Sequence, residues 1–263
     1  MALRLLQVDA FTDKPFGGNP AAVVFLDRER APEWMQSVAM EMNLSETAFL
    51  LVEGDGWRLR WFTPSVEVDL CGHATLASAH ALWEEGRAPK SGQIRFFTKS
   101  GELRAASRDG VIELDFPATP AEIAEPPAEL VKAMGVSPQF CGRTRFDWFF
   151  LLSSESSVRL LVPDFKALGR ATERGVIVTA RSSSDDCDFV SRFFAPAAGI
   201  DEDPVTGSAH CALGPFWAER LGKKTLQARQ VSRRGGALSV RVDGERVFIG
   251  GRAATTVRGE LLP

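Results

Sequence analysis

Residues 60–86 read RWFTPSVEVDLCGHATLASAHALWEEG, and residues 192–222 read RFFAPAAGIDEDPVTGSAHCALGPFWAERLG. The two stretches match at an offset of 132 to 135 residues, close to half of the 263-residue chain. Each copy has a short aromatic strand, a Pro-containing turn, a loop, a glycine (Gly72 or Gly207) and then a helix of small and apolar residues. The repeat therefore predicts a duplicated fold.

The glycine at the start of each predicted helix indicates a site for an anion. The first turn of a helix has unpaired backbone N–H groups and a partial positive charge, which together bind anions. A glycine before an Ala-rich helix can also be only a tight turn, but that reading does not explain the polar residues at both openings: Cys71 and His73 at one, Asp203, Thr206 and Ser208 at the other. If the two halves face each other, we expect both helix N-termini in one cleft.

Composition limits the class of protein. A chain of this length has room for two modest domains. Its net charge is −3 with both signs spread along the sequence, so no basic face is available for nucleic acid. No apolar run approaches the length needed to span a bilayer, which predicts a soluble protein without a membrane partner. A small-molecule partner is expected.

The four cysteines, Cys71, Cys141, Cys187 and Cys211, form no C-x-x-C pair and accompany only three histidines. This pattern argues against a zinc site and against a disulfide scaffold. We therefore expect reduced thiols, a cytoplasmic location and no metal.

Alternating and periodic patterns predict a strand-rich α+β chain with two long central helices. The expected strands are residues 3–11, 21–26, the apolar part of 43–52 that follows Glu46, 57–63, 94–98, 101–107, 111–116, 148–152, 158–162, 175–180, 188–194, 239–242, 246–250 and a final strand to 258. The expected shorter helices are 32–42, 128–134 and 164–171. The Pro-rich segment 117–127 reads as the connection between halves. The predicted domains are 1–117, to which the C-terminal strand 255–263 can also belong, and 118–254.

Two polar residues near the first half's strands are ambiguous from the local pattern. Glu46 stands between a helix end and an apolar strand, where it is either solvated at a strand edge or drawn into a cleft in which burial raises its pKa and suits it to carry protons. Asn19, in the glycine-rich loop FGGNP, either caps that turn or faces a ligand.

Four blocks, VDAFTDKPFGGNPAAV, NLSETAF, CGHAT and EDPVTGSAH, occur in this order along the whole chain. In this respect the sequence resembles the PhzF-like family of phenazine-biosynthesis-type isomerases, whose fold is shared with diaminopimelate epimerase. The resemblance implies two pseudo-symmetric domains, each a curved β-sheet wrapped around a central α-helix, with the active site between them. It also implies an isomerase that uses no cofactor and no metal and is commonly a homodimer.

The resemblance also implies roles for individual residues. Glu46 corresponds to the family's acid/base, His73 to the histidine of the CGH block, and Asp203 and Ser208 to the DPVTGS block. The implied reaction moves a proton on a small carboxylic acid whose carboxylate rests on the amides of Gly72 and His73 or of Gly207 and Ser208. His73 and Asp203 would orient the substrate, with Asn19 in contact and Ser208 as a donor.

Cysteine placement separates this prediction from a related one. A two-base epimerase needs a cysteine at each opening. Cys71 fills the first place, whereas we expect Pro204 or a neighbour at the second and Cys211 inside the helix as a buried packing residue. A single-base reaction, or one that uses Glu46 against His73, is preferred. An epimerase or racemase that uses Cys71 and a non-catalytic carboxylate-binding protein are the alternatives, and the substrate, product and pathway are left open.

Overall fold

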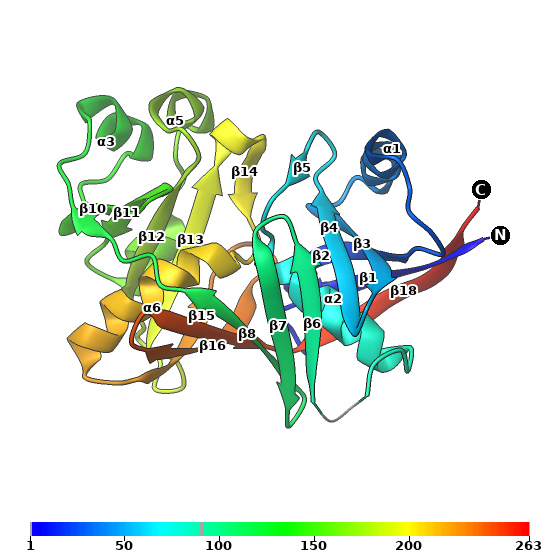
Figure 1. Ribbon diagram of the computed structural model, residues 1–263. Helices are drawn as coiled ribbons and strands as arrows, with labels where there is room; N and C mark the ends of the chain where they lie inside the picture. The colour runs from blue at the N-terminus through cyan, green and yellow to red at the C-terminus, as the bar shows by residue number, and fades with distance from the viewer. Residues whose placement is uncertain (1, 90–91, 263) are drawn as a thin grey trace. The chain divides into compact units, whose positions relative to one another are not determined.

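The computed structural model describes residues 2–89 and 92–262, and the chain divides into two compact units (Figure 1). Unit 1 comprises Met1–Phe116 and Gly250–Pro263, and unit 2 comprises Pro117–Ile249. Each unit contains a β-sheet and one long, buried helix. No helix within the described ranges combines the length and the apolar character that crossing a membrane requires.

Unit 1 is a mixed sheet curled around helix α2. Its elements are β1 (Leu3–Ala10), β2 (Asn19–Phe25), α1 (Pro32–Met42), β3 (Glu46–Glu53), β4 (Gly56–Phe62), β5 (Glu67–Val68), α2 (Gly72–Glu84), β6 (Gln93–Thr98), β7 (Gly101–Arg108), β8 (Val111–Pro117) and β18 (Ala253–Leu261). Hydrogen-bonded neighbours follow the order β18-β1-β2-β3-β4-β6-β7-β8, with β2–β3 and β4–β6 parallel and the other pairs antiparallel. The short strand β5 is also paired with β4.

Unit 2 repeats this arrangement. Its elements are β9 (Glu122–Ile123), α3 (Ala128–Met134), β10 (Phe140–Arg143), β11 (Asp147–Leu151), α4 (Glu155–Leu160), α5 (Phe165–Ala171), β12 (Gly175–Arg181), β13 (Phe189–Ala195), a 3₁₀ turn (Pro196–Ala198), β14 (Ile200–Asp203), α6 (Gly207–Leu221), β15 (Thr225–Gln230), β16 (Gly236–Asp243) and β17 (Arg246–Gly251), which ends in unit 1. The strand order is β9-β10-β11-β12-β13-β15-β16, with β11–β12 and β13–β15 parallel and β14 on β13.

The central strands of the two sheets are paired in the same order and with the same directions. The parallel pair β2–β3 corresponds to β11–β12, the hairpin β3–β4 to β12–β13, and the parallel pair β4–β6 to β13–β15. Even an ion pair recurs: Arg60 forms a bidentate pair with Glu67 in unit 1, and Arg192 does so with Glu202 in unit 2. The predicted α+β fold of two similar halves is confirmed.

Small residues allow α2 to lie at the centre of its unit. Its alanines and leucines are fully buried, and the helix packs on β1, β2, β3 and β18. Two buried hydroxyl groups on the helix are satisfied locally, because Thr75 donates to the carbonyl of Cys71 and Ser78 to that of Ala74. The helix can therefore be buried on all sides without leaving these polar groups unpaired.

Helix α1 covers the opposite face of the unit 1 sheet. Its residues Met35 and Val38 pack with Phe49 and Phe62 in one apolar cluster. The helix ends at Asn43, which adopts the left-handed conformation expected of a helix-terminating asparagine. Since successive side chains of a strand point to opposite faces, Phe49 faces α1, and Glu46 on the same strand faces α2.

One predicted strand is wrong. Residues 158–162, which are mostly valine and leucine, were expected to be extended, but Glu155–Leu160 is helix α4. The side chain of Ser154 accepts a hydrogen bond from the amide of Ser157 and so caps the helix, and Glu155 pairs with Arg159 one turn later. Only Val158 of this helix is buried, so the apolar pattern did not mark a sheet face.

Candidate functional site

The first candidate site lies at the N-terminus of α2. Glu46 begins β3, and His73 is the second residue of α2. Their side chains meet with 2.9 Å between Glu46 Oε2 and His73 Nε2. The carboxylate is 17% exposed and the imidazole 6% exposed, so Glu46 is not a solvated strand-edge residue. The fold has brought together two ionisable groups that are 27 positions apart in the sequence.

Asn19 and Cys71 complete this group. The Asn19 amide nitrogen lies 3.2 Å from His73 Nδ1, and the Cys71 sulfur lies 3.6 Å from the same atom. Asn19 is fully buried at the start of β2 and follows Gly18, where a Cβ atom would lie only 2.0 Å from the carbonyl oxygen of Ala10. The FGGNP loop therefore needs glycine at this position to hold Asn19 against the ring.

Charge placement sets the protonation of His73 and Cys71. Burial by itself would lower the pKa of His73, but the neighbouring Cys71 and Glu46 groups raise it well above its ordinary value. Burial, reinforced by the Glu46 charge, raises the pKa of the Cys71 thiol to about 11. The thiol is therefore neutral at neutral pH, and Cys71 and Glu46 together favour the protonated form of His73.

The carboxylate of Glu46 has spare capacity. Its Oε2 atom is within ion-pair distance of His73, yet among the described residues it has no aligned hydrogen-bond partner. A buried acceptor without a hydrogen bond is unusual in a folded protein and often marks a functional site. The first-turn amides of α2, which no side chain of the N-cap residue Cys71 caps, add hydrogen-bonding capacity for an anionic group.

Metal binding is possible in principle at the same group. One ligand atom each from Glu46, Cys71 and His73 lies within 4.8 Å of the others. Zinc accepts carboxylate, thiolate and imidazole ligands, but it requires the cysteine to lose its proton. Since the pKa of Cys71 is about 11, that loss opposes metal binding at neutral pH. The absence of a metal stays a prediction.

The second candidate site lies at the N-terminus of α6 and carries a different set of side chains. Asp203 ends β14, Thr206 is the N-cap residue, and Gly207 and Ser208 begin the helix. The Thr206 hydroxyl donates to Asp203 Oδ2 over 2.5 Å. Buried Gln230 accepts from the amide of Thr206 and donates to the carbonyl of Asp203. At least part of the Asp203 carboxylate thus holds the loop together.

An arginine and an aspartate that the sequence did not single out complete this second group. Arg174 forms a bidentate pair with Asp147, with N–O distances of 2.7 and 2.5 Å, and its Nη2 atom donates to Ser208 Oγ over 3.2 Å. Burial raises the pKa of Asp147, although Arg174 acts in the opposite direction. The sequence position of Arg174 could have indicated it, because Arg174 directly precedes the apolar strand β12 as Ser45 directly precedes β3.

The structure makes the cysteine prediction more specific. The expected counterpart of Cys71 was Pro204 or a neighbour, and the helix register, which matches Gly72 with Gly207, gives that place to Thr206. Cys211 lies within α6, is 5% exposed and points at the carbonyl of Gly207, and burial raises the pKa of its thiol to about 12. It is the packing residue that was predicted.

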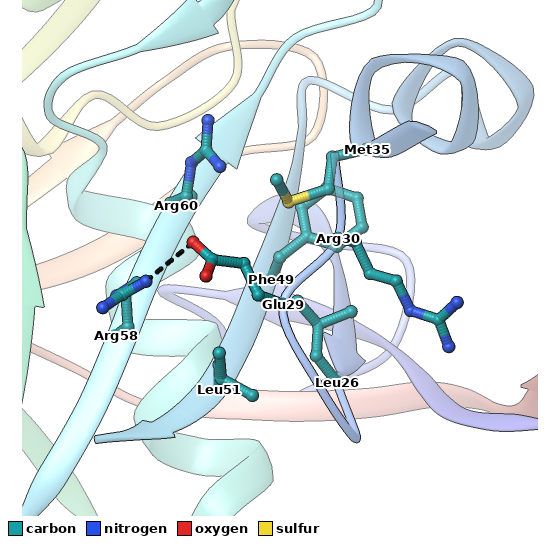
Figure 2. A pocket seen from close by; sticks show the side chains of 8 residues that line it. All are labelled: Leu26, Glu29, Arg30, Met35, Phe49, Leu51, Arg58 and Arg60. Atoms are coloured by element: carbon teal, nitrogen blue, oxygen red, sulfur yellow. Dashed lines mark hydrogen bonds and ion pairs between the residues drawn. The ribbon is translucent and has the colours of Figure 1, made fainter. Parts of the chain in front are cut away.

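A separate pocket of about 260 Å³, which includes space open to solvent, lies on the α1 face of the unit 1 sheet (Figure 2). Its lining residues are Leu26, Glu29, Arg30, Met35, Phe49, Leu51, Arg58 and Arg60. Figure 2 shows the Arg58 guanidinium paired with Glu29, at 3.0 Å, above an apolar floor. None of the predicted site residues lines this pocket, and Glu46 faces the other side of β3.

Comparison with known proteins identifies the family. Residues 8–259 match the model of the family described as phenazine biosynthesis-like protein. An uncharacterized isomerase of Halalkalibacterium halodurans is 52% identical over 263 residues, which cover 100% of this chain and 99% of that relative.

Solved structures agree. A crystal structure of a PhzF-family phenazine biosynthesis protein from Enterococcus faecalis has a TM-score of 0.95 and 43% identity, with full coverage of both chains. The fold alone is shared with a hydroxyproline epimerase from Agrobacterium vitis, at a TM-score of 0.62 and 12% identity, over 99% of this chain and 92% of that one. The repeated sheet-and-helix units and the full-length match show that this chain belongs to the PhzF (phenazine biosynthesis-like) family.

Proposed function

We propose that this protein, like its relative named as an isomerase, is an isomerase that moves a proton within a small carboxylic acid, with Glu46 as the general acid/base. The observation that supports it is the buried contact between Glu46 Oε2 and His73 Nε2, at 2.9 Å. A carboxylate held in this way can take a proton from a substrate carbon and return it elsewhere.

His73 supports the charge changes at Glu46. While Glu46 is ionised, the protonated imidazole stabilises it at 2.9 Å. When Glu46 has accepted a proton, the imidazolium is free to interact with negative charge on the substrate. The amides of Gly72 and His73, at the positive end of α2, can bind a carboxylate or the charge that develops at the reacting carbon. Neither step calls on a cofactor.

The unit 2 residues Asp203, Gly207 and Ser208 are proposed to bind the substrate rather than to transfer protons. Ser208 supplies a hydroxyl and α6 a second set of first-turn amides. Asp203 accepts the hydroxyl of Thr206 and so positions the residue that precedes the first-turn amides of α6. A homodimer and a cytoplasmic location remain expectations from the family resemblance.

Deuterium exchange tests the proposal. Wild-type protein is incubated in D₂O with small 2-amino, 2-hydroxy and unsaturated ring carboxylic acids, and loss of C–H signals is followed by ¹H NMR. We expect at least one acid to exchange and Glu46→Gln to slow that exchange by about 10²–10⁴-fold. Glu29→Gln, at an exposed carboxylate on the other face of the sheet, is the matched control and retains the wild-type rate.

Exchange at the wild-type rate in Glu46→Gln contradicts the proposed role of this residue. Binding of acids without any exchange favours a non-catalytic carboxylate-binding protein instead.

An epimerase that uses Cys71 is the second candidate, because this thiol lies 3.6 Å from His73. It is less favoured, since the thiol is neutral and its counterpart in unit 2 is the hydroxyl of Thr206. We expect Cys71→Ser to change the exchange rate by less than about tenfold. Complete loss of exchange in Cys71→Ser, with Glu46 intact, would favour the epimerase.

A further inference from the structure

Arg174 is held in one orientation by three neighbours. Its Nε and Nη2 atoms bind both oxygens of Asp147, which is 3% exposed. Its guanidinium carbon lies 5.2 Å from the centre of the Phe146 ring and 5.5 Å from that of Phe193. A bidentate carboxylate and two aromatic rings leave an arginine little freedom to rotate. The side chain is therefore fixed before any ligand arrives.

The fixed guanidinium determines what the hydroxyl of Ser208 can do. Arg174 Nη2 lies 3.2 Å from Ser208 Oγ, and because a guanidinium can only donate, the serine oxygen is the acceptor. The hydroxyl hydrogen of Ser208 must then point away from Arg174. Within the described part of the chain this serine has no other side-chain hydrogen bond, so its hydrogen is available to a ligand.

The equivalent place in unit 1 shows that this arrangement is specific to unit 2. Strand register matches Glu46 with Gly175 and helix register matches His73 with Ser208. A side chain at Gly175 would place its Cβ atom 2.6 Å from the carbonyl of Phe194, so a carboxylate cannot stand there. Arg174, the residue before, supplies a charged group next to the helix opening instead.

We propose that Arg174 is a positioning residue that fixes Ser208 as a hydrogen-bond donor, so that the α6 opening recognises an anionic oxygen of the substrate. The ligand chemistry is that of a carboxylate or an enolate-type oxygen, because the positive end of the Asp147–Arg174 pair faces Ser208 and disfavours an ammonium group. The inference rests on the proposed function, in which this same opening binds the substrate acid.

Titration with benzoate tests the inference in the full-length protein. The probe is followed through the backbone amide signals of Gly207 and Ser208 in ¹H–¹⁵N NMR spectra at constant ionic strength. We expect Arg174→Met and Ser208→Ala each to weaken benzoate binding by about tenfold, the value of one charge-assisted hydrogen bond. The double variant should bind no more weakly than Ser208→Ala, because Arg174 acts through Ser208.

Two further variants exclude simple structural damage. Arg174→Lys keeps the charge but not the bidentate geometry, and we expect it to recover only part of the affinity. Arg143→Met is the matched control, because Arg143 also pairs with a carboxylate, Glu173, and lies over an aromatic ring, that of Trp148. It should bind benzoate as the wild type does. If Arg174→Met does not fold, Arg174→Lys and Ser208→Ala complete the same cycle.

Unchanged benzoate affinity in Arg174→Met, fully additive losses in the double variant, or no benzoate binding by the wild type would overturn the inference. Its failure is separable from that of the proposed function. Glu46→Gln should bind benzoate normally, so loss of Glu46-dependent exchange and loss of Arg174-dependent binding are independent results.

Discussion

The openings of α2 and α6 start from the same backbone plan and carry different chemistry. At α2 the neighbouring groups are Glu46, His73 and Cys71, all of which can exchange protons. At α6 the corresponding positions hold Gly175, Ser208 and Thr206, which do not titrate near neutral pH. Duplication thus supplied two equivalent helix N-termini, and the side chains made one suited to proton transfer and the other to fixed hydrogen bonding.

A histidine inside α6 provides the strongest way to sharpen this comparison. Thr75 in α2 donates its hydroxyl to the carbonyl of Cys71, and His210, at the matching position in α6, uses its Nδ1 to contact the carbonyl of Thr206 over 2.8 Å. His210 is fully buried, and among the described residues its Nε2 has no hydrogen-bond partner. Burial lowers the pKa of His210 to about 4. The histidine is therefore neutral in the folded protein.

The lowered pKa of His210 predicts a loss of stability in mild acid. Below pH 6.5, the ordinary pKa of histidine, His210 binds a proton in the unfolded chain, but in the folded chain it stays neutral down to about pH 4. The free energy of unfolding therefore falls as the pH falls through that range. We expect a loss of about 2 kcal/mol between pH 7 and pH 5. Chemical denaturation at the two pH values measures it.

His210→Thr places in α6 the residue type that α2 has at the matching position, Thr75. This variant should be less stable at pH 7 because the smaller side chain leaves a cavity, and its stability should no longer show the part of the pH dependence that is due to His210. The raised pKa of His73 does not mimic this effect, since its contribution is fully present below 6.5 and is lost only as pH rises through its folded value. Equal pH dependence in wild type and variant would contradict the assignment.

The recurring ion pairs provide a test of equivalence with a smaller expected effect. Glu67 and Glu202 are 14% and 19% exposed and hold Arg60 and Arg192 in the same bidentate geometry. We expect Glu67→Gln and Glu202→Gln each to lower the free energy of unfolding by about 1 kcal/mol, because a partly buried bidentate pair is worth more than an exposed one. Thermal unfolding of both variants beside Arg229→Gln, which removes the exposed pair with Asp186, measures the losses.

If the losses of the two glutamate variants differ by more than about 1 kcal/mol, the two ion pairs share their geometry but do not contribute equally to stability. Lys99 also contacts Glu67, so any difference should be in the direction of a larger loss in unit 1.

The sequence predicted helices and strands correctly where neighbouring residues mark their ends. Helices Pro32–Met42 and Ala128–Met134 were predicted at their observed bounds because proline at or before their starts and a left-handed residue after their ends mark them. Strand Thr225–Gln230 was missed, since its buried apolar positions are only Leu226 and Ala228. Residues 158–162 were wrongly predicted as a strand from their apolar residues, because the cap that Ser154 provides favours a helix at this place.

The candidate site divides in the same way. Glu46 and His73 were found from motif blocks, but their 2.9 Å contact depends on how β3 passes the start of α2, which no spacing encodes. Arg174 and Asp147 were missed because they lie outside those blocks. The pairing of β11 with β12 brings these two residues together, and Arg174 then contacts Ser208 at the start of α6. Contacts made across a sheet are the part that needed the structure.

The protonation of His73 tests the central claim most directly, because it requires no substrate. We expect ¹⁵N NMR titration of the His73 imidazole in the wild-type protein to give a pKa above 6.5, and Glu46→Gln to bring that pKa down, since Glu46 is, with Cys71, one of the two neighbours that raise it against the effect of burial. A pKa for His73 at or below 6.5 that does not respond to Glu46→Gln would contradict the account, because the two side chains would then not act as a charged pair.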